Sequence, residues 1–235
     1  MREEYRREMN CQIVHDSWHE RGFTDSYILK VDGRLVGYGS VGGSPGEPRV
    51  VVKEFFVLPD CRGMAAPLLR GLSEKSGATT IEAQTNDRLL SLLLWDHAAN
   101  VVSDTILFAD ATTTNVRLPG TILRRLAKAD RVRSFPHTTE PVGDWGLEQE
   151  GHIVATGGLF FHYNPPYGDI YMEVAATHRR RGLGSLLVQE LKRIAREGGH
   201  VPAARCSSDN LASRLTLERA GMLPCARILR GRLAA

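Results

Sequence analysis

The spacing of apolar residues indicates two helices in the second half of the chain. Apolar residues recur every three or four positions, with Arg and Glu between them, at Leu183, Leu186, Leu187, Leu191 and Ile194. This repeat places the apolar side chains on one face of a helix. It predicts a helix over 182–197, which the pair Gly198-Gly199 ends. A second helix is predicted over 211–220, because Asn210 can cap its start and Gly221 follows its end.

Shorter apolar and alternating runs in the same half predict strands. Their ranges are roughly 146–151, 153–162, 169–174, 203–207 and 225–229. The basic stretch 124–135 precedes them and is predicted to be a helix with a solvated face. An aromatic segment, 160–171, is expected to connect two of the strands, either as a plain packed loop or as part of an acceptor site.

The same order of elements occurs twice along the chain. Matching residues of two predicted hairpins lie 118 positions apart: Leu29 and Leu147, Gly33 and Gly151, Val36 and Val154. Further matches follow in the same order: Val57 and Val174, Arg62 and Arg179, Asn86 and Asn210. We therefore expect an α/β (α+β) fold with two similar modules, residues 1–114 and 115–235. Each should be a mixed twisted sheet flanked by helices.

Composition narrows the class of partner. The chain has 30 Lys and Arg against 27 Asp and Glu, and a net charge of +3 does not favour nucleic acid or a membrane surface. The first residues are charged, unlike a secretory signal, and no apolar run is long enough to span a bilayer. The four cysteines form no CxxC pair. We therefore expect no metal site, no disulfide framework and a cytoplasmic protein.

The segment HRRRGLG, 178–184, carries the most specific chemistry. It joins the predicted strand 169–174 to the predicted helix 182–197, and the N-terminus of a helix offers free N–H groups and a positive dipole end. Gly182 and Gly184 leave room for a ligand to approach the backbone, and the three arginines suit phosphate. The Gly-Lys-Ser/Thr ending of a Walker loop is absent. The segment therefore predicts a site for a pyrophosphate, or else an ordinary junction between a loop and a helix.

Together with the sequence DNLASRLTLERAGM, this loop resembles the GNAT (GCN5-related N-acetyltransferase) superfamily. The family's Gln/Arg-x-x-Gly-x-Gly/Ala loop matches Arg179, Gly182 and Gly184, and its later Asn-x-x-Ala/Ser stretch matches Asn210 and Ser213. The resemblance covers nearly all of the second half, and extends more weakly to the first half through the repeat. Where the family has a Tyr in the following helix, this chain has Leu217.

The resemblance implies that acetyl-CoA (coenzyme A) binds at this loop. The loop N–H groups would hold the pyrophosphate, the pantetheine arm would lie beside 173–175, and a backbone N–H near Val174 would polarise the acetyl carbonyl. The implied cofactor-binding residues are Val174, Ala175, Arg179, Arg180, Arg181, Gly182, Leu183, Gly184, Ser185, Asn210 and Ser213. Ala65 and Pro67 stand in the first half where Gly182 and Gly184 stand in the second. Because Pro67 has no N–H, we expect the first module to have lost coenzyme A binding.

Acetyl transfer to an amine needs a base, donors for the oxyanion and a proton for the leaving thiolate. Glu173, at the end of the strand 169–174, is the candidate base, against the alternative of a solvent-facing carboxylate. His178 is a candidate proton shuttle or a surface histidine. Since Leu217 cannot act as the acid, the candidates are water and four side chains: Cys206, Ser207, Ser208 and Ser213.

We therefore expect an N-acetyltransferase that moves an acetyl group from acetyl-CoA to a primary amine by direct attack. The alternative is an acyl-CoA-binding or regulatory module without turnover. Paired GNAT-like folds also occur in aminoacyl-tRNA-dependent peptidyl transferases, but those lack an intact coenzyme A loop. The sequence leaves the small-molecule or peptide amine acceptor open. It is compatible with a monomer or a homodimer, and a monomer is preferred because the repeat can supply packing within one chain.

Overall fold

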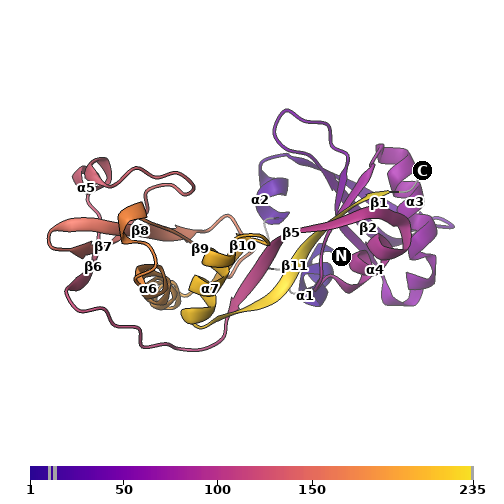
Figure 1. Ribbon diagram of the computed structural model, residues 1–235. Coiled ribbons are helices and arrows are strands. Elements are labelled where there is room, and N and C mark those ends of the chain that lie inside the picture. The colour runs from indigo at the N-terminus through magenta and orange to yellow at the C-terminus, as the bar shows by residue number, and fades with distance from the viewer. Residues whose placement is uncertain (10–11, 13–14, 234–235) are drawn as a thin grey trace. The chain divides into compact units, whose positions relative to one another are not determined.

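A computed structural model describes residues 1–9, 12 and 15–233 of the chain, shown in Figure 1. These residues form two compact units. The first comprises Met1–Ile106 together with the residues from Ala226 onward, and the second comprises Leu107–Cys225. Both units combine a mixed sheet with helices, as the sequence predicts for the fold class.

The first unit is built on strands in the order β1-β2-β3-β4-β11. Neighbouring strands are antiparallel except for β3 and β4, which are parallel. Helices α3 and α4 supply Leu69, Leu72, Leu90 and Leu94 to its core. Its elements are α1 (Arg2–Met9), α2 (His15–Glu20), β1 (Thr24–Val31), β2 (Arg34–Gly42), β3 (Val51–Val57), the 3₁₀ helix η1 (Pro59–Met64), α3 (Ala65–Ser76), β4 (Thr80–Gln84), α4 (Arg88–His97) and the start of β5 (Ala98–Asp110).

The second unit repeats this plan with strands in the order β10-β9-β8-β7-β6. Strands β9 and β10 are parallel, and the other pairs are antiparallel. Helix α6 packs on β8 and β9. Its elements are β6 (Thr121–Arg125), α5 (Lys128–Arg133), β7 (Trp145–Gln149), β8 (His152–Phe160), β9 (Tyr167–Val174), the 3₁₀ helix η2 (Ala176–His178), α6 (Leu183–Glu197), β10 (Val201–Ser207), α7 (Leu211–Arg219) and the start of β11 (Met222–Leu233).

The two hairpin turns have matching backbones. Asp32 and Gly33 have φ values of 49° and 81°, and Glu150 and Gly151 have 49° and 77°. Two successive residues with positive φ define the type I′ turn, whose twist suits a two-residue hairpin. The hairpins predicted around Gly33 and Gly151 are therefore confirmed in both units.

One predicted helix is wrong in part. The stretch 124–135 was expected to be helical throughout, but Arg124 and Arg125 end strand β6, and α5 covers Lys128–Arg133 alone. Arg124 is held on the strand by Glu148 of β7 and by Asp130 of α5, at 2.6 and 2.7 Å. Pairing with the neighbouring strand therefore decides the conformation there, against the local charge pattern.

The two units differ in two respects from the sequence-based division at 114 and 115: the boundary lies between Ile106 and Leu107, and the residues from Ala226 onward belong to the first unit. Residues 228–232 of β11 pair antiparallel with β4, from Ile228 opposite Gln84 to Arg232 opposite Thr80. The last strand thus completes the sheet of the first unit. Lys192 is buried in the second unit and connects its first residues to the end of α7. Its Nζ lies 2.7 Å from the carbonyl oxygens of Thr112 and Ala220 and 2.9 Å from the carboxylate of Asp110.

Candidate functional site

The loop between β9 and α6 turns on residues with positive φ. Gly182 is the N-cap of α6 with a φ of 83°, and Arg180 has a φ of 62°. These values let the chain reverse direction within a few residues of the end of β9. The helix then begins at Leu183. The N–H groups of its first turn have no carbonyl partner within the helix, because no helical turn precedes them. An anion is stabilised at such a position.

A cavity of about 770 Å³ lies at this helix N-terminus. Its walls come from the end of β9, the start of α6, helix α7 and the segment 138–140. The structure brings these sequence-predicted residues together around it: Glu173, Val174, Arg179, Arg180, Gly182, Leu183, Gly184, Ser185, Asn210 and Ser213. Ala175 and Arg181 do not line it. The Ala175 side chain is buried and its N–H donates to the carbonyl of Val154, while Arg181 is exposed.

Helix α7 forms one wall because its start is fixed by a cap. The side chain of Asn210 accepts a hydrogen bond from the N–H of Ser213 at 3.0 Å, as expected of an N-cap. Thr216 of α7 accepts a hydrogen bond at its carbonyl from the hydroxyl of Ser185 on α6. A Cβ atom on Gly184 would lie 2.9 Å from Thr216 Cγ2. The second glycine of the loop is thus needed for close packing of α6 and α7, as well as for an open cavity.

Arg179 folds back onto the end of β9. Its Nε donates to the carbonyl of Val174 at 3.1 Å, and its Nη2 lies 3.6 Å from Glu173 Oε1. Half of its side chain remains exposed. The guanidinium therefore braces the loop at the mouth of the cavity and still presents positive charge to solvent.

Glu173 lies on β9 and is bound by the segment 138–140 across from it. Its carboxylate accepts hydrogen bonds from the N–H groups of Thr138, Thr139 and Glu140, at 3.0 to 3.2 Å, and from the Thr138 hydroxyl at 2.9 Å. Burial opposes ionisation, but these donors outweigh it and lower the pKa of Glu173 to about 2. A carboxylate with so low a pKa and so many donors is a weak proton acceptor, and the arrangement is that of an anchor for the segment.

Asp169 is a second buried carboxylate on the same face of β9, and the sequence analysis did not select it. It is 3% exposed, and Tyr163 and Arg205 are its polar neighbours. Burial raises its pKa to about 7, although Arg205, whose Nε lies 3.7 Å from Oδ2, opposes the rise. An acidic residue inside an otherwise apolar strand was the available signal.

Asp169 also marks the end of the contact between β9 and β10. The parallel register covers Tyr167 to Asp169 on β9 and Val201 to Ala203 on β10. The later part of β9, Met172 to Val174, lines the cavity instead. An unpaired strand edge of this kind leaves backbone groups free for a ligand that adds alongside it.

The remaining candidates for proton transfer occupy different surroundings. His178 lines the cavity, with its Nδ1 2.9 Å from the hydroxyl of Thr177. Ser213 also lines it, whereas Cys206 and Leu217 are buried. Ser207 and Ser208 are exposed. Within the described ranges, no group of three or more His, Cys, Asp or Glu is arranged to hold a metal ion, and no helix is long and apolar enough to cross a membrane.

Comparison with known sequences gives one match. Residues 117–222 match the profile of the Acetyltransferase (GNAT) family, which covers the loop, α6 and α7. This match supports the conclusion that the protein is an acyltransferase. No curated protein is a significant match to the sequence.

Comparison with solved structures gives likeness over nearly the whole chain. An acetyltransferase from the GNAT family of Colwellia psychrerythraea is 17% identical, with a TM-score of 0.73, over 97% of this chain and 94% of that one. A GCN5-related N-acetyltransferase from Sphaerobacter thermophilus is 16% identical, with a TM-score of 0.61, over 98% and 90%. A tandem GNAT protein from the clavulanic acid biosynthesis pathway is 16% identical, with a TM-score of 0.59, over 90% and 83%. At these identities the likeness establishes the fold.

Proposed function

We propose that this protein is an N-acetyltransferase that takes acetyl-CoA as donor and a primary amine as acceptor, and that the reaction occurs in the cavity of the second unit. The observation that carries the proposal is the open cavity at the N-terminus of α6, bounded by a glycine loop and by arginines. The family match over 117–222, which contains this cavity, supports the same reaction.

The residues around the cavity fit coenzyme A. The first turn of α6 and Arg179 and Arg180 provide donors and positive charge for a pyrophosphate. A volume of about 770 Å³ is within the range of sites for cofactors of this size. The free edge of β9 at Met172 to Val174 suits an extended arm with amide groups, which can bind as an added strand.

Acetyl-CoA supplies the acetyl group as a thioester, and the chain has to manage two protons. One leaves the attacking amine, and one reaches the thiolate that departs. The role of Glu173 as the base stays a prediction, which its low pKa and its four donors do not favour. Asp169 has a pKa of about 7, which suits a base, but its side chain is buried and does not line the cavity. Water or Ser213 remains available as the acid.

We propose that the acceptor is a small-molecule or peptide amine and that the protein works in the cytoplasm. The carboxylate of Glu140 lines the wall of the cavity and favours an acceptor that arrives as a cation. We further propose that the chain is a tandem form whose first module, residues 1–114, has lost coenzyme A binding. The loop positions Ala65 and Pro67 support this, since Pro67 lies in the first turn of α3 and has no N–H.

The second candidate is a module that binds acyl-CoA without turnover. Leu217 favours it, because this side chain is buried at the position where the family resemblance implies an acidic Tyr. The two candidates share the cavity and differ in chemistry alone.

Isothermal titration with acetyl-CoA, followed by a thiol-release assay on a panel of primary amines, tests both. Binding of one acetyl-CoA per chain with amine-dependent thiol release supports the transferase. Binding without release for any amine supports the second candidate. An absence of binding would remove both, and would leave the cavity without a ligand of this class.

A further inference from the structure

The first unit contains the same elements that surround the cavity in the second unit, but the pocket that its described residues form between them is far smaller. The end of β3 corresponds to the end of β9, and Arg62 corresponds to Arg179. Asp87 caps α4 as Asn210 caps α7, so the structural counterpart of Asn210 is one position after Asn86, its match in the sequence repeat. The space between these elements is about 10 Å³ in the first unit, against about 770 Å³ in the second. The smaller volume is at the limit of what one water molecule requires.

The N-terminal helix α1 fills this place. Tyr5, Glu8 and Met9 line what remains of the space, together with residues of β3 and α4. Tyr5 and Met9 are 3% and 4% exposed. The ring of Tyr5 meets the rings of Tyr38 and Phe56 edge to face, with centroids 5.8 and 6.4 Å apart. Such contacts stabilise beyond the area that they bury.

Three polar side chains around this cleft are paired with α1. The hydroxyl of Tyr5 donates to Asp87 Oδ2 at 3.0 Å, and the side chain of Asn86 donates to the carbonyl of Met9 at 3.1 Å. Arg62 forms an ion pair with Glu8. Arg62 and Asp87, the counterparts of Arg179 and Asn210, are therefore bound to side chains of α1.

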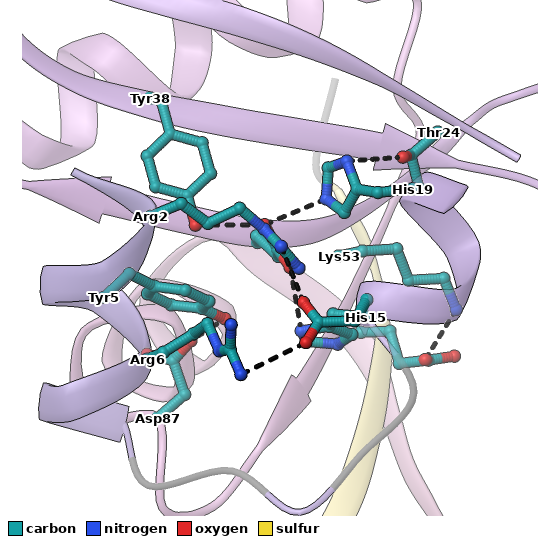
Figure 2. A network of polar contacts seen from close by, with 12 residues as sticks. Arg2, Tyr5, Arg6, His15, His19, Thr24, Tyr38, Lys53 and Asp87 are labelled. Carbon is teal, nitrogen blue, oxygen red and sulfur yellow. Dashed lines mark hydrogen bonds and ion pairs between the residues drawn. The ribbon is translucent and has the colours of Figure 1, made fainter. Parts of the chain in front are cut away.

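A buried carboxylate on β3, that of Glu54, contacts residues of α1 and α2. Its partners Arg2, His19 and Tyr38 are labelled in Figure 2. Glu54 is 1% exposed and accepts hydrogen bonds from Arg2 and Tyr38, at 3.1 and 3.0 Å. Nitrogen atoms of His15 and His19 lie 3.2 Å from it. Burial opposes ionisation, but these partners keep the pKa of Glu54 well below its usual range. The carboxylate is therefore charged at neutral pH and binds both helices.

We propose that α1 is a permanent occupant of the first unit's cleft and that it closes this cleft to ligands. An isolated helix of eight residues is barely stable in water, so α1 depends on its contacts in this cleft for its helical structure. The cleft of the first unit is thus filled by the chain, and Pro67 is a second and separate obstacle. The inference rests on the geometry of the first unit and does not depend on which ligand the second unit binds.

The test removes the two side chains that fill the cleft from the full-length protein. In the double variant Tyr5→Ala/Met9→Ala, the cleft should become a cavity with Phe55, Phe56 and Leu89 on its apolar side, and apolar surface of this kind binds apolar probes. The dye ANS, added to the free protein, should bind in greater amount per chain to this variant than to wild type. Bound ANS should slow amide hydrogen exchange in 51–57 and 86–91. The matched control is Glu4→Ala/Arg7→Ala, which changes two exposed positions of the same helix and should bind ANS as wild type does.

Equal ANS binding by the double variant and the control, with native near-UV circular dichroism in both, would overturn the proposal. If the double variant does not fold, hydrogen exchange on the wild type decides. Amides of α1 should then exchange at least about tenfold more slowly than those of a free peptide of the same sequence. Amide exchange of α1 at the rate of the free peptide would overturn the proposal that α1 stays bound in the cleft. Because no coenzyme A is used, failure here is distinct from failure of the proposed acetyl transfer.

Discussion

The hydroxyl of Thr138 donates a hydrogen bond to Glu173 Oε1 at 2.9 Å, and the N–H of Thr138 reaches the same carboxylate. These bonds join a segment that precedes β7 to the last residues of β9. They place the backbone of 138–140 along the wall of the cavity. The carboxylate therefore shapes the site whether or not it takes part in proton transfer.

Replacement of Glu173 by Gln should lower the free energy of unfolding by about 1–3 kcal/mol, because an amide cannot satisfy four donors as a carboxylate does. Thermal or urea unfolding measures this change. Under the anchoring role, KM for the amine rises and kcat changes little. A general base would instead show a large loss of kcat with unchanged KM. The control Glu190→Gln alters an exposed ion pair with Arg193 and should have little effect on either constant.

Gly182→Val should abolish measurable binding of acetyl-CoA by calorimetry. The φ of Gly182 is 83°, a region that β-branched residues avoid at a cost of about 1–2 kcal/mol, and the side chain would enter the cavity mouth. Gly199→Val is the matched control, because Gly199 has a φ of 78° after the end of α6 and lies away from the cavity. Both variants should lose similar stability. If Gly182→Val still binds acetyl-CoA as tightly as the control, the loop is not the pyrophosphate site.

Asp169→Asn should reduce kcat about a hundredfold if this carboxylate is the base. The wild-type rate should rise with pH through about 7, as the carboxyl loses its proton, and the variant should show no such step. Calorimetry should give unchanged affinity for acetyl-CoA. A wild-type pH profile retained in full by Asp169→Asn would exclude this residue from proton transfer.

Asp87 should make the protein less stable as the pH rises. Burial raises its pKa to about 6, from 3.8, so between these values the folded state holds a proton that the unfolded state releases. Stability is therefore lost as the pH rises through this window, by up to about 3 kcal/mol. The groups that face Asp87 are Tyr5, Glu8 and His15.

The comparison with Asp87→Asn isolates this effect, because Asn keeps the helix cap. Unfolding by urea at pH 4 and pH 7 should show that the variant gains stability relative to wild type at the higher pH. A constant difference between the two proteins across this range would mean that Asp87 does not titrate there.

Local patterns in the sequence were sufficient for the two longest helices of the second unit. The helix predicted over 182–197 is observed as Leu183–Glu197, and the one over 211–220 as Leu211–Arg219. Both predictions rested on the period of the apolar residues and on caps, which act within one or two turns. The loop residues also came from a local motif, and the structure gathers most of them around one cavity.

Contacts between distant residues could not be predicted in the same way. Glu173 looked like a free carboxylate because its donors, at 138–140, lie more than thirty positions away. Tyr5 and Asp87 are separated by 82 positions, and no local pattern links them. Asp169 was overlooked because only the packing of Arg205 and the neighbouring strands shows how deeply it is buried.

Strand β11 has a consequence for synthesis of the protein on the ribosome. Residues 228–232 supply a strand beside β4, so the first unit remains incomplete until the ribosome has passed those codons. The whole of 107–225 emerges earlier and contains every residue assigned to its own unit. We therefore expect the second unit to complete its fold first, against the usual order in which N-terminal domains fold first during translation. Until residues 228–232 are made, the edge of β4 in the nascent chain has no neighbouring strand. An unpaired strand edge is a surface that can associate with other chains and that chaperones protect.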